Sequence, residues 1–240
     1  MRVSQEPAYV LHHYDYGETS LLLEMFTRQH GRLGLIAKGA RRPRSPLRPA
    51  LIPFQPLAVS FSGRGELPTL TTVEPTEHAS VIAGEALFCG LYLNELLLRL
   101  LHRHDPHERL FASYAQALGR LGAESKFEAT LRIFEKRLLE EIGFGLVLDH
   151  DVQDGKALQA EQRYRYLPER GPVLAATTED DGIAMQGASL LALARESLED
   201  KEVLSETKRL MRALLTRHLG TRPLTTRDLF QPRRAGGALE

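Results

Sequence analysis

Basic side chains that could bind phosphate groups are concentrated in one stretch of the chain. Eight Lys or Arg residues and no Asp or Glu occur between Met25 and Gly65, although the 240-residue chain has 31 basic and 31 acidic side chains. The eight are Arg28, Arg32, Lys38, Arg41, Arg42, Arg44, Arg48 and Arg64. Those from Lys38 to Arg48 lie in a segment punctuated by Gly, Pro and Ser. A flexible cationic loop of this kind can neutralise a nucleic-acid backbone without reading base edges.

A run of charge is also typical of an ordinary solvated surface, so its context decides between the two interpretations. The formal net charge is zero, which makes this stretch a local patch and not part of a generally basic protein. Four aromatic residues, Tyr14, Tyr16, Phe26 and Phe54, lie nearby in the sequence. They are candidates for stacking on bases or for the core of the domain.

Three histidines and an aspartate gather in a second group that could bind a metal. His102, His104 and His107 surround Asp105-Pro106. Zinc ligands on a helix must share one face, and Pro106 interrupts any helix between them. We therefore expect a polar helix end here and not a metal site.

A third group, Asp149, Asp151 and Asp154 followed by Gly155, resembles the start of a calcium-binding loop. The glycine comes one position too late and no helix follows in register, so the pattern favours a turn.

Gly143-Phe-Gly145 follows a predicted helix, which makes it a helix C-cap and not a phosphate-binding loop. No Walker, nucleophile-elbow or Cys/His signature occurs in the sequence. The chain is expected to be no enzyme and to hold no cofactor and no metal.

Cysteine content and hydropathy indicate the cellular compartment of the protein. Cys89 is the only cysteine, so no internal disulfide or cysteine-based zinc cluster can form. The N-terminus has no apolar signal core, and the most apolar window, 86 to 101, contains Asn94, Glu95 and Arg99. We expect a cytoplasmic protein with no membrane contact.

The first third of the chain has the alternating pattern of β-strands. Strands are expected at 8–14, 19–27, 32–38, 57–62 and 66–74, separated by turns that contain Gly or Pro. Five short strands in a domain spanning residues 1–75 predict a small barrel, for which an OB fold is favoured and an SH3-like barrel fits almost as well.

The rest of the chain has a helical period and predicts an α+β multidomain protein. Helices are expected at 77–103 with Thr76 as N-cap, from Asp105-Pro106 to 121, from Ser125 to 142, at 187–199 and at 203–219. The first is apolar nearly all round, as in the buried centre of a bundle. Residues 146–185 are expected to form an irregular insertion with a short hairpin. The helical domain would span 76–230, and 231–240 would be a disordered tail.

An ordered set of short motifs covers residues 8 to 230 and resembles one protein family. In the first domain the set is Tyr9-Val-Leu11, Gly17-Glu-Thr-Ser-Leu21, Phe26-Thr27, His30-Gly31, Ala37-Lys-Gly-Ala-Arg41, Leu51, Pro53-Phe54 and Gly63-Arg-Gly-Glu66. In the second it is Gly90-Leu-Tyr-Leu-Asn-Glu-Leu96, Leu131-Arg-Ile-Phe-Glu135, Leu138-Leu139, Gly143-Phe-Gly145, Tyr164-Arg-Tyr166, Leu219-Gly, Pro223-Leu224 and Arg227-Asp-Leu-Phe230. The set is similar to that of the bacterial recombination mediator family RecO.

The resemblance implies a non-enzymatic protein, with an OB fold and a helical domain, that binds single- and double-stranded DNA and anneals complementary strands. It also implies cooperation with RecR, often RecF, and the acidic C-terminal tail of single-stranded-DNA-binding protein, and association with the nucleoid. Many relatives carry a four-cysteine zinc site after the helix matching 125–142. This chain has no cysteine there, so no zinc is expected.

Annealing brings together two strands of like charge, for which a second cationic surface would help. Candidates on the last helix are Lys208, Arg209, Arg212 and Arg217, which equally fit a solvated helix face. Arg132 is the candidate for binding a carboxylate of the partner's tail, because Arg pairs with carboxylates in a bidentate way. A protein adaptor with incidental DNA contact, and an RNA-binding OB protein, remain the alternatives.

Overall fold

The computed structural model describes residues 2–76, 81–124, 126–176, 182–220 and 222–226. The chain divides into two compact units, one of residues 1–106 with 220–240 and one of residues 107–219. The tail expected at 231–240, and the helix start expected at Ser125, lie outside the described residues.

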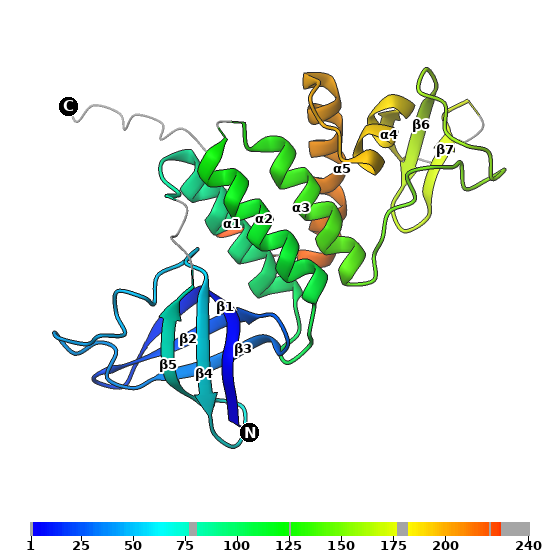
Figure 1. Cartoon of the computed structure of the whole chain (residues 1–240). Coiled ribbons are helices and arrows are strands. Elements are labelled where there is room, and N and C mark those ends of the chain that lie inside the picture. The colour runs from blue at the N-terminus through cyan, green and yellow to red at the C-terminus, as the bar shows by residue number, and fades with distance from the viewer. Residues whose placement is uncertain (1, 77–80, 125, 177–181, 221, 227–240) are drawn as a thin grey trace, which may run out of the picture. The chain divides into compact units, whose positions relative to one another are not determined.

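Five strands of the first unit form a closed barrel (Figure 1). They are β1 (Arg2–Tyr16), β2 (Ser20–Thr27), β3 (Gly31–Ala37), β4 (Leu57–Ser62) and β5 (Thr69–Pro75). Their order around the barrel is β1-β2-β3-β5-β4, and a parallel bridge from Ile36 to Thr69 joins β3 to β5. This is the strand order of an OB fold, so that prediction is confirmed and the SH3-like alternative is excluded.

The barrel core comes from the alternating inward side chains that the sequence pattern predicted. Val10, Leu23, Met25, Leu35 and Val59 are fully buried at its centre. A register shift between Val10 and His12 marks a bulge in β1. Such a bulge bends and twists a strand, and here β1 runs on to Tyr16 with its last residues exposed.

Helix α1 (Glu85–Leu100) belongs to the same unit and packs on the barrel. The Asn94 side-chain amide donates to the Leu11 carbonyl oxygen over 2.9 Å. Gly90 lies against the Phe54 ring, because a Cβ on Gly90 would come within 2.9 Å of it. The helix begins at Glu85 after Gly84, so the N-cap expected at Thr76 is wrong.

Two charged side chains of α1 bind residues 222–226. The Glu95 carboxylate accepts hydrogen bonds from the backbone N–H and hydroxyl groups of Thr225 and Thr226. Arg99 donates to the carbonyl oxygens of Arg222 and Pro223. Burial acts to raise the pKa of Glu95, but the bonds from Thr226 and Thr225 outweigh it and lower the pKa below its ordinary value.

The second unit contains α2 (Glu108–Ala123), α3 (Glu128–Glu141), α4 (Gly187–Arg195) and α5 (Lys201–Leu219). Helices α2 and α3 pack together through the rings of Tyr114 and Phe134, whose centroids are 6.2 Å apart. Helix α2 begins at Glu108 after His107, so the start expected at Asp105-Pro106 is wrong. The C-cap predicted at Gly143 is confirmed, because Gly143 has φ +89° and the Phe144 backbone N–H donates to the Leu139 carbonyl oxygen.

The insertion expected to hold a short hairpin contains a three-stranded sheet. The strands β6 (Arg163–Leu167), β7 (Gly171–Leu174) and β8 (Ile183–Gln186) pair in the order β7-β6-β8. Strand β8 leads directly into α4, and Figure 1 shows the sheet beside that helix. Among the described residues, no helix is long and apolar enough to cross a membrane.

Candidate nucleic-acid interface

The predicted cationic segment forms a loop, here called the basic loop, that spans residues 38–56 between β3 and β4. Two consecutive turns fold its first part, closed by hydrogen bonds from Arg42 N–H to Gly39 oxygen and from Ser45 N–H to Arg42 oxygen. Ala40 and Leu51 are buried in the barrel core. The loop is therefore held to the barrel by its apolar residues while its basic residues face outward.

Arg41 fixes the basic loop to the turn between β1 and β2. Its guanidinium lies 3.0 Å from the Asp15 carboxylate and donates to the Gly17 carbonyl oxygen over 3.1 Å. Its backbone N–H donates to the Thr19 oxygen. The charge of Arg41 is already offset by Asp15, so this residue positions the loop more than it adds free charge.

Arg32 has a structural environment of its own. Its Nε atom lies 3.3 Å from the buried Glu24 carboxylate, and its Nη1 atom donates to the carbonyl oxygens of Leu98 and Leu101 at the end of α1. Arg103 also pairs with Glu24. These contacts occupy the Arg32 guanidinium, so we do not count Arg32 among the cations that can bind a ligand. Arg28 is exposed just after β2.

The other basic residues of the predicted patch are exposed and have no carboxylate partner in the described part of the chain. They are Lys38, Arg42, Arg44, Arg48 and Arg64. Lys38, Arg42 and Arg44, with Gly39, Pro43, Ser45, Pro46 and Leu47, line an open cavity of about 730 Å³ in the basic loop. A concave site with three unpaired cations and apolar walls suits an anionic chain whose sugars and bases are partly apolar.

Two of the four candidate aromatic residues lie at the surface beside this loop. Tyr14 is 50% exposed and Tyr16 is 45% exposed, whereas Phe26 and Phe54 are buried in the core. Both tyrosines flank Asp15, the residue that pairs with Arg41. His12, which no sequence motif singled out, packs its ring edge-on against Tyr14 with centroids 4.5 Å apart.

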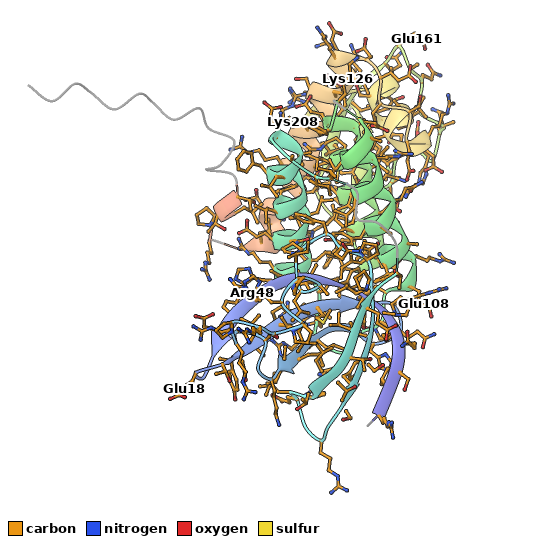
Figure 2. The ribbon with its side chains drawn as sticks, turned by 60° about the vertical axis from the view of Figure 1, so that its left-hand side comes forward. Glu18, Arg48, Glu108, Lys126, Glu161 and Lys208 are labelled. Atoms are coloured by element: carbon orange, nitrogen blue, oxygen red, sulfur yellow. The ribbon has the colours of Figure 1, made fainter. Side chains whose placement is uncertain are left out.

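The second cationic group, on α5, is largely paired with acidic groups. Lys208 lies 2.5 Å from Glu128, and Arg217 lies 3.0 Å from Glu169. Arg209 donates to the Ala184 oxygen and lies 3.8 Å from Glu206. Arg212 is exposed and forms no ion pair with any described residue. Figure 2 labels Lys208 in the second unit and Arg48 in the first.

Arg132 is buried, and its guanidinium pairs with Glu135 over 2.5 Å. This position disfavours Arg132 as a surface contact for a partner's carboxylate. A small depression of about 10 Å³ between α2 and α3, here called the groove, has Arg120 and Arg137 half-buried on its rim and Ala117, Ile133 and Phe134 buried on its floor. Its combination of an apolar floor with a basic rim was not visible in the sequence, because it needs residues from two helices.

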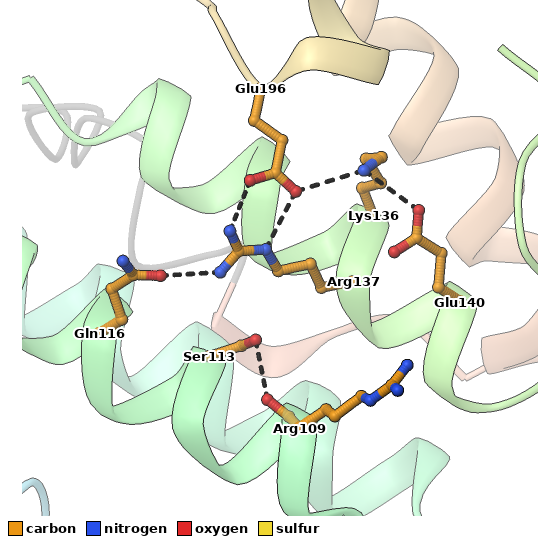
Figure 3. Close-up of polar contacts among 7 residues, drawn as sticks. All are labelled: Arg109, Ser113, Gln116, Lys136, Arg137, Glu140 and Glu196. Atoms are coloured by element: carbon orange, nitrogen blue, oxygen red, sulfur yellow. Dashed lines mark hydrogen bonds and ion pairs between the residues drawn. The ribbon is translucent and has the colours of Figure 1, made fainter. Parts of the chain in front are cut away.

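One side of this groove is held by the charged network in Figure 3. Arg137 donates to Glu196 and to Gln116, and Lys136 lies 3.2 Å from Glu196 and 3.1 Å from Glu140. The hydrogen bond to Glu196 raises the pKa of Arg137. Burial acts to raise the pKa of Glu196, but its bonds from Arg137 and Lys136 lower it below the ordinary value. Arg120 forms no ion pair within the described residues.

The turn predicted at residues 149–155 is confirmed, and its carboxylates are occupied by protein donors. Asp151 is buried and accepts from the backbone N–H groups of Gln153 and Leu174, each over 2.7 Å. Asp154 pairs with Lys156. The described residues contain no group of three His, Cys, Asp or Glu side chains placed to hold a metal ion. The absence of zinc remains a prediction.

The described first unit belongs to the class of OB-type barrels. Its basic loop carries several cations without a carboxylate partner among the described residues, beside exposed aromatic rings. Residues 1–79 match the family model "Recombination protein O N terminal", and residues 83–228 match "Recombination protein O C terminal". The chain belongs to the Recombination protein O (RecO) family.

Curated relatives match over nearly the full length of the chain. The "DNA repair protein RecO" of Nitrosospira multiformis is 46% identical over 231 residues, which cover 96% of each chain. The protein of the same name from Polynucleobacter asymbioticus is 50% identical over 236 residues, again 96% of each chain. That from Coxiella burnetii is 47% identical over 95% of this chain and 98% of its own.

Proposed function

We propose that this chain binds single- and double-stranded DNA through the basic loop, without catalysis or a cofactor, and anneals complementary strands during DNA repair. The observation that carries the proposal is the group of exposed basic residues on an OB-type barrel that lack a carboxylate partner in the described structure. Phosphate contacts of this kind are tolerant of sequence. Such a protein would act at the nucleoid, in the cytoplasm.

A salt series tests this function. We expect binding of an oligonucleotide to weaken steeply as salt rises, with a log–log slope of roughly −0.7 per phosphate contacted on a single strand. Annealing of two complementary strands is expected to accelerate in the presence of the protein at low salt. Weak, salt-independent binding would instead favour an adaptor of protein partners. A matched RNA strand that binds tighter than DNA would favour an RNA-binding protein.

The relatives' family suggests partners as part of the same proposal: RecR, RecF and the acidic C-terminal tail of single-stranded-DNA-binding protein. Arg120 on the rim of the groove between α2 and α3 has the chemistry for a carboxylate of such a tail, because it is only half-buried and has no ion-pair partner in the described residues. The buried Arg132, paired with Glu135, is disfavoured for this contact.

An Arg120→Ala variant separates these two arginines. We expect it to lower the affinity for an acidic tail peptide about tenfold, as the loss of one charge-assisted contact does. Fluorescence anisotropy of a labelled peptide measures this. Arg109→Ala, on the same helix but outside the groove lining, is the matched control. Unchanged peptide affinity of the Arg120 variant would remove the groove from the proposal.

A further inference from the structure

The outer face of β1 carries three rings in a row. His12, Tyr14 and Tyr16 alternate with His13 and Asp15, so they lie on one face of the strand. Across the sheet, Tyr14 pairs with Leu22, which in turn pairs with Ile36. Leu22 and Ile36 are only half-buried, so the row from Tyr14 to Ile36 is an apolar shelf open to solvent.

The neighbouring row is covered, which limits the shelf on one side. There, Glu24 is buried and pairs with Arg32 and Arg103. A Cβ on Gly34 would come within 2.9 Å of the Leu67 side chain and 3.0 Å of Arg103. These residues leave the two tyrosines and the half-buried aliphatic pair as the accessible part of the face.

The charges around the shelf favour an anionic ligand. Lys38 follows β3 directly, and the basic loop is fixed to the turn beside Tyr16 by the Arg41–Asp15 pair. Of the nearby carboxylates, Asp15 and Glu24 are paired with arginines, and Glu18 lies at the tip of the exposed turn (Figure 2). Aromatic rings beside unpaired cations are the combination that binds unpaired nucleic-acid strands.

The spacing of the two tyrosines bears on the form of nucleic acid. Residues two apart on a strand are about 6.6 Å apart, twice the rise of about 3.3 Å per residue. Bases in a duplex are stacked about 3.4 Å apart along each strand, which leaves no room for a ring between them. Rings at the wider spacing can stack only on bases that have left the duplex stack.

We propose that Tyr14 and Tyr16 form a base-stacking shelf that makes this protein bind unpaired strands more tightly than duplex, while the basic loop binds the phosphates of either form. This inference rests on the proposed DNA-binding function. The site then has two parts: the tyrosine shelf, which distinguishes single strands from duplex, and the basic loop, which does not.

A double variant, Tyr14→Ala with Tyr16→Ala, tests the shelf. We expect its affinity for an oligothymidine strand to fall at least tenfold, because two base-stacking contacts are lost. Its affinity for a duplex of equal length should stay within about twofold, and the salt slope on the single strand should not change, because no cation is removed. Fluorescence anisotropy across a salt series measures all three quantities.

Tyr14→Phe with Tyr16→Phe is the matched control, since it keeps both rings and removes only the hydroxyl groups. This variant should bind like the wild type. The chain has no Trp and seven Tyr, so quenching of tyrosine emission by the bound strand gives an independent signal that the Ala variant should reduce. Circular dichroism checks that both variants fold.

Two results would overturn the shelf while leaving the proposed function intact: an Ala variant that binds the single strand as the wild type does, or one that loses single-strand and duplex affinity equally. A Phe variant as weak as the Ala variant would also overturn stacking, because the hydroxyl groups would then carry the contact. Wild-type protein that binds neither form would contradict the proposed function itself.

Discussion

A variant with Lys38, Arg42 and Arg44 all changed to Ala should lose most of the ionic part of DNA binding. These three cations line the cavity of the basic loop and have no carboxylate partner in the described residues. With about 0.7 counterion released per phosphate on a single strand, the log–log salt slope should become shallower by roughly two units. Affinity at low salt should fall at least tenfold for single strands and for duplex alike.

The matched control is a variant that removes three cations from α5, namely Lys208, Arg209 and Arg217. Each lies near an acidic group, Glu128, Glu206 and Glu169 respectively, so the control changes the net charge equally and frees three carboxylates. We expect a much smaller change in slope. If the control lost as much slope as the loop variant, the overall charge and not the basic loop would govern binding, and α5 would regain its place as a second cationic surface.

Arg41→Ala should behave differently from the triple loop variant. Arg41 is paired with Asp15, so its removal costs little free charge but detaches the basic loop from the turn after β1. The salt slope should change by less than one unit while affinity still falls. Grouping Arg41 with Arg42 and Arg44, as the sequence alone suggests, would mix a positioning effect with an ionic effect.

The strand pattern was predictable because each barrel strand buries alternate residues, and the period is local. Strand β4 matches its predicted limits, 57 to 62, and β3 differs by one residue at each end. Strand β8 was missed because it has four residues and pairs with β6, about 20 residues earlier in the chain. The start of α1 was misplaced because Thr76 is a suitable cap residue that the chain does not use.

For the site, the charge segregation was visible in the sequence but the state of each cation was not. Glu24 stands immediately before the stretch without carboxylates, and the β2–β3 pairing brings it beside Arg32. Folding likewise brings Arg41 of the basic loop beside Asp15 near the end of β1. Because these pairs form only in the folded barrel, no spacing rule separates the structural arginines from those free to bind a phosphate.

Glu24→Gln should destabilise the first unit more than removal of an exposed charge does. Its carboxylate is buried between the guanidinium groups of Arg32 and Arg103, and Arg32 also binds the last carbonyl oxygens of α1. Removing one partner of a buried ion pair typically costs about 3 to 5 kcal/mol. Because the Arg103 side chain is 36% exposed and can turn to solvent, we expect a cost nearer 2 to 3 kcal/mol.

Amide hydrogen exchange measures this cost in the first unit directly, which matters because a chain of two compact units need not unfold in one step. The amides of β2, β3 and the last turn of α1 should lose protection together, since Glu24 and Arg32 connect all three. Glu169→Gln removes the exposed partner of Arg217 and is the control, with an expected cost below about 1 kcal/mol. If both variants lost equally little stability, the buried Glu24 cluster would stabilise the protein no more than an exposed ion pair does. A large effect confined to the Glu24 variant would explain why α1 is part of the barrel's unit: a buried charge on β2 holds the arginine that binds the end of the helix.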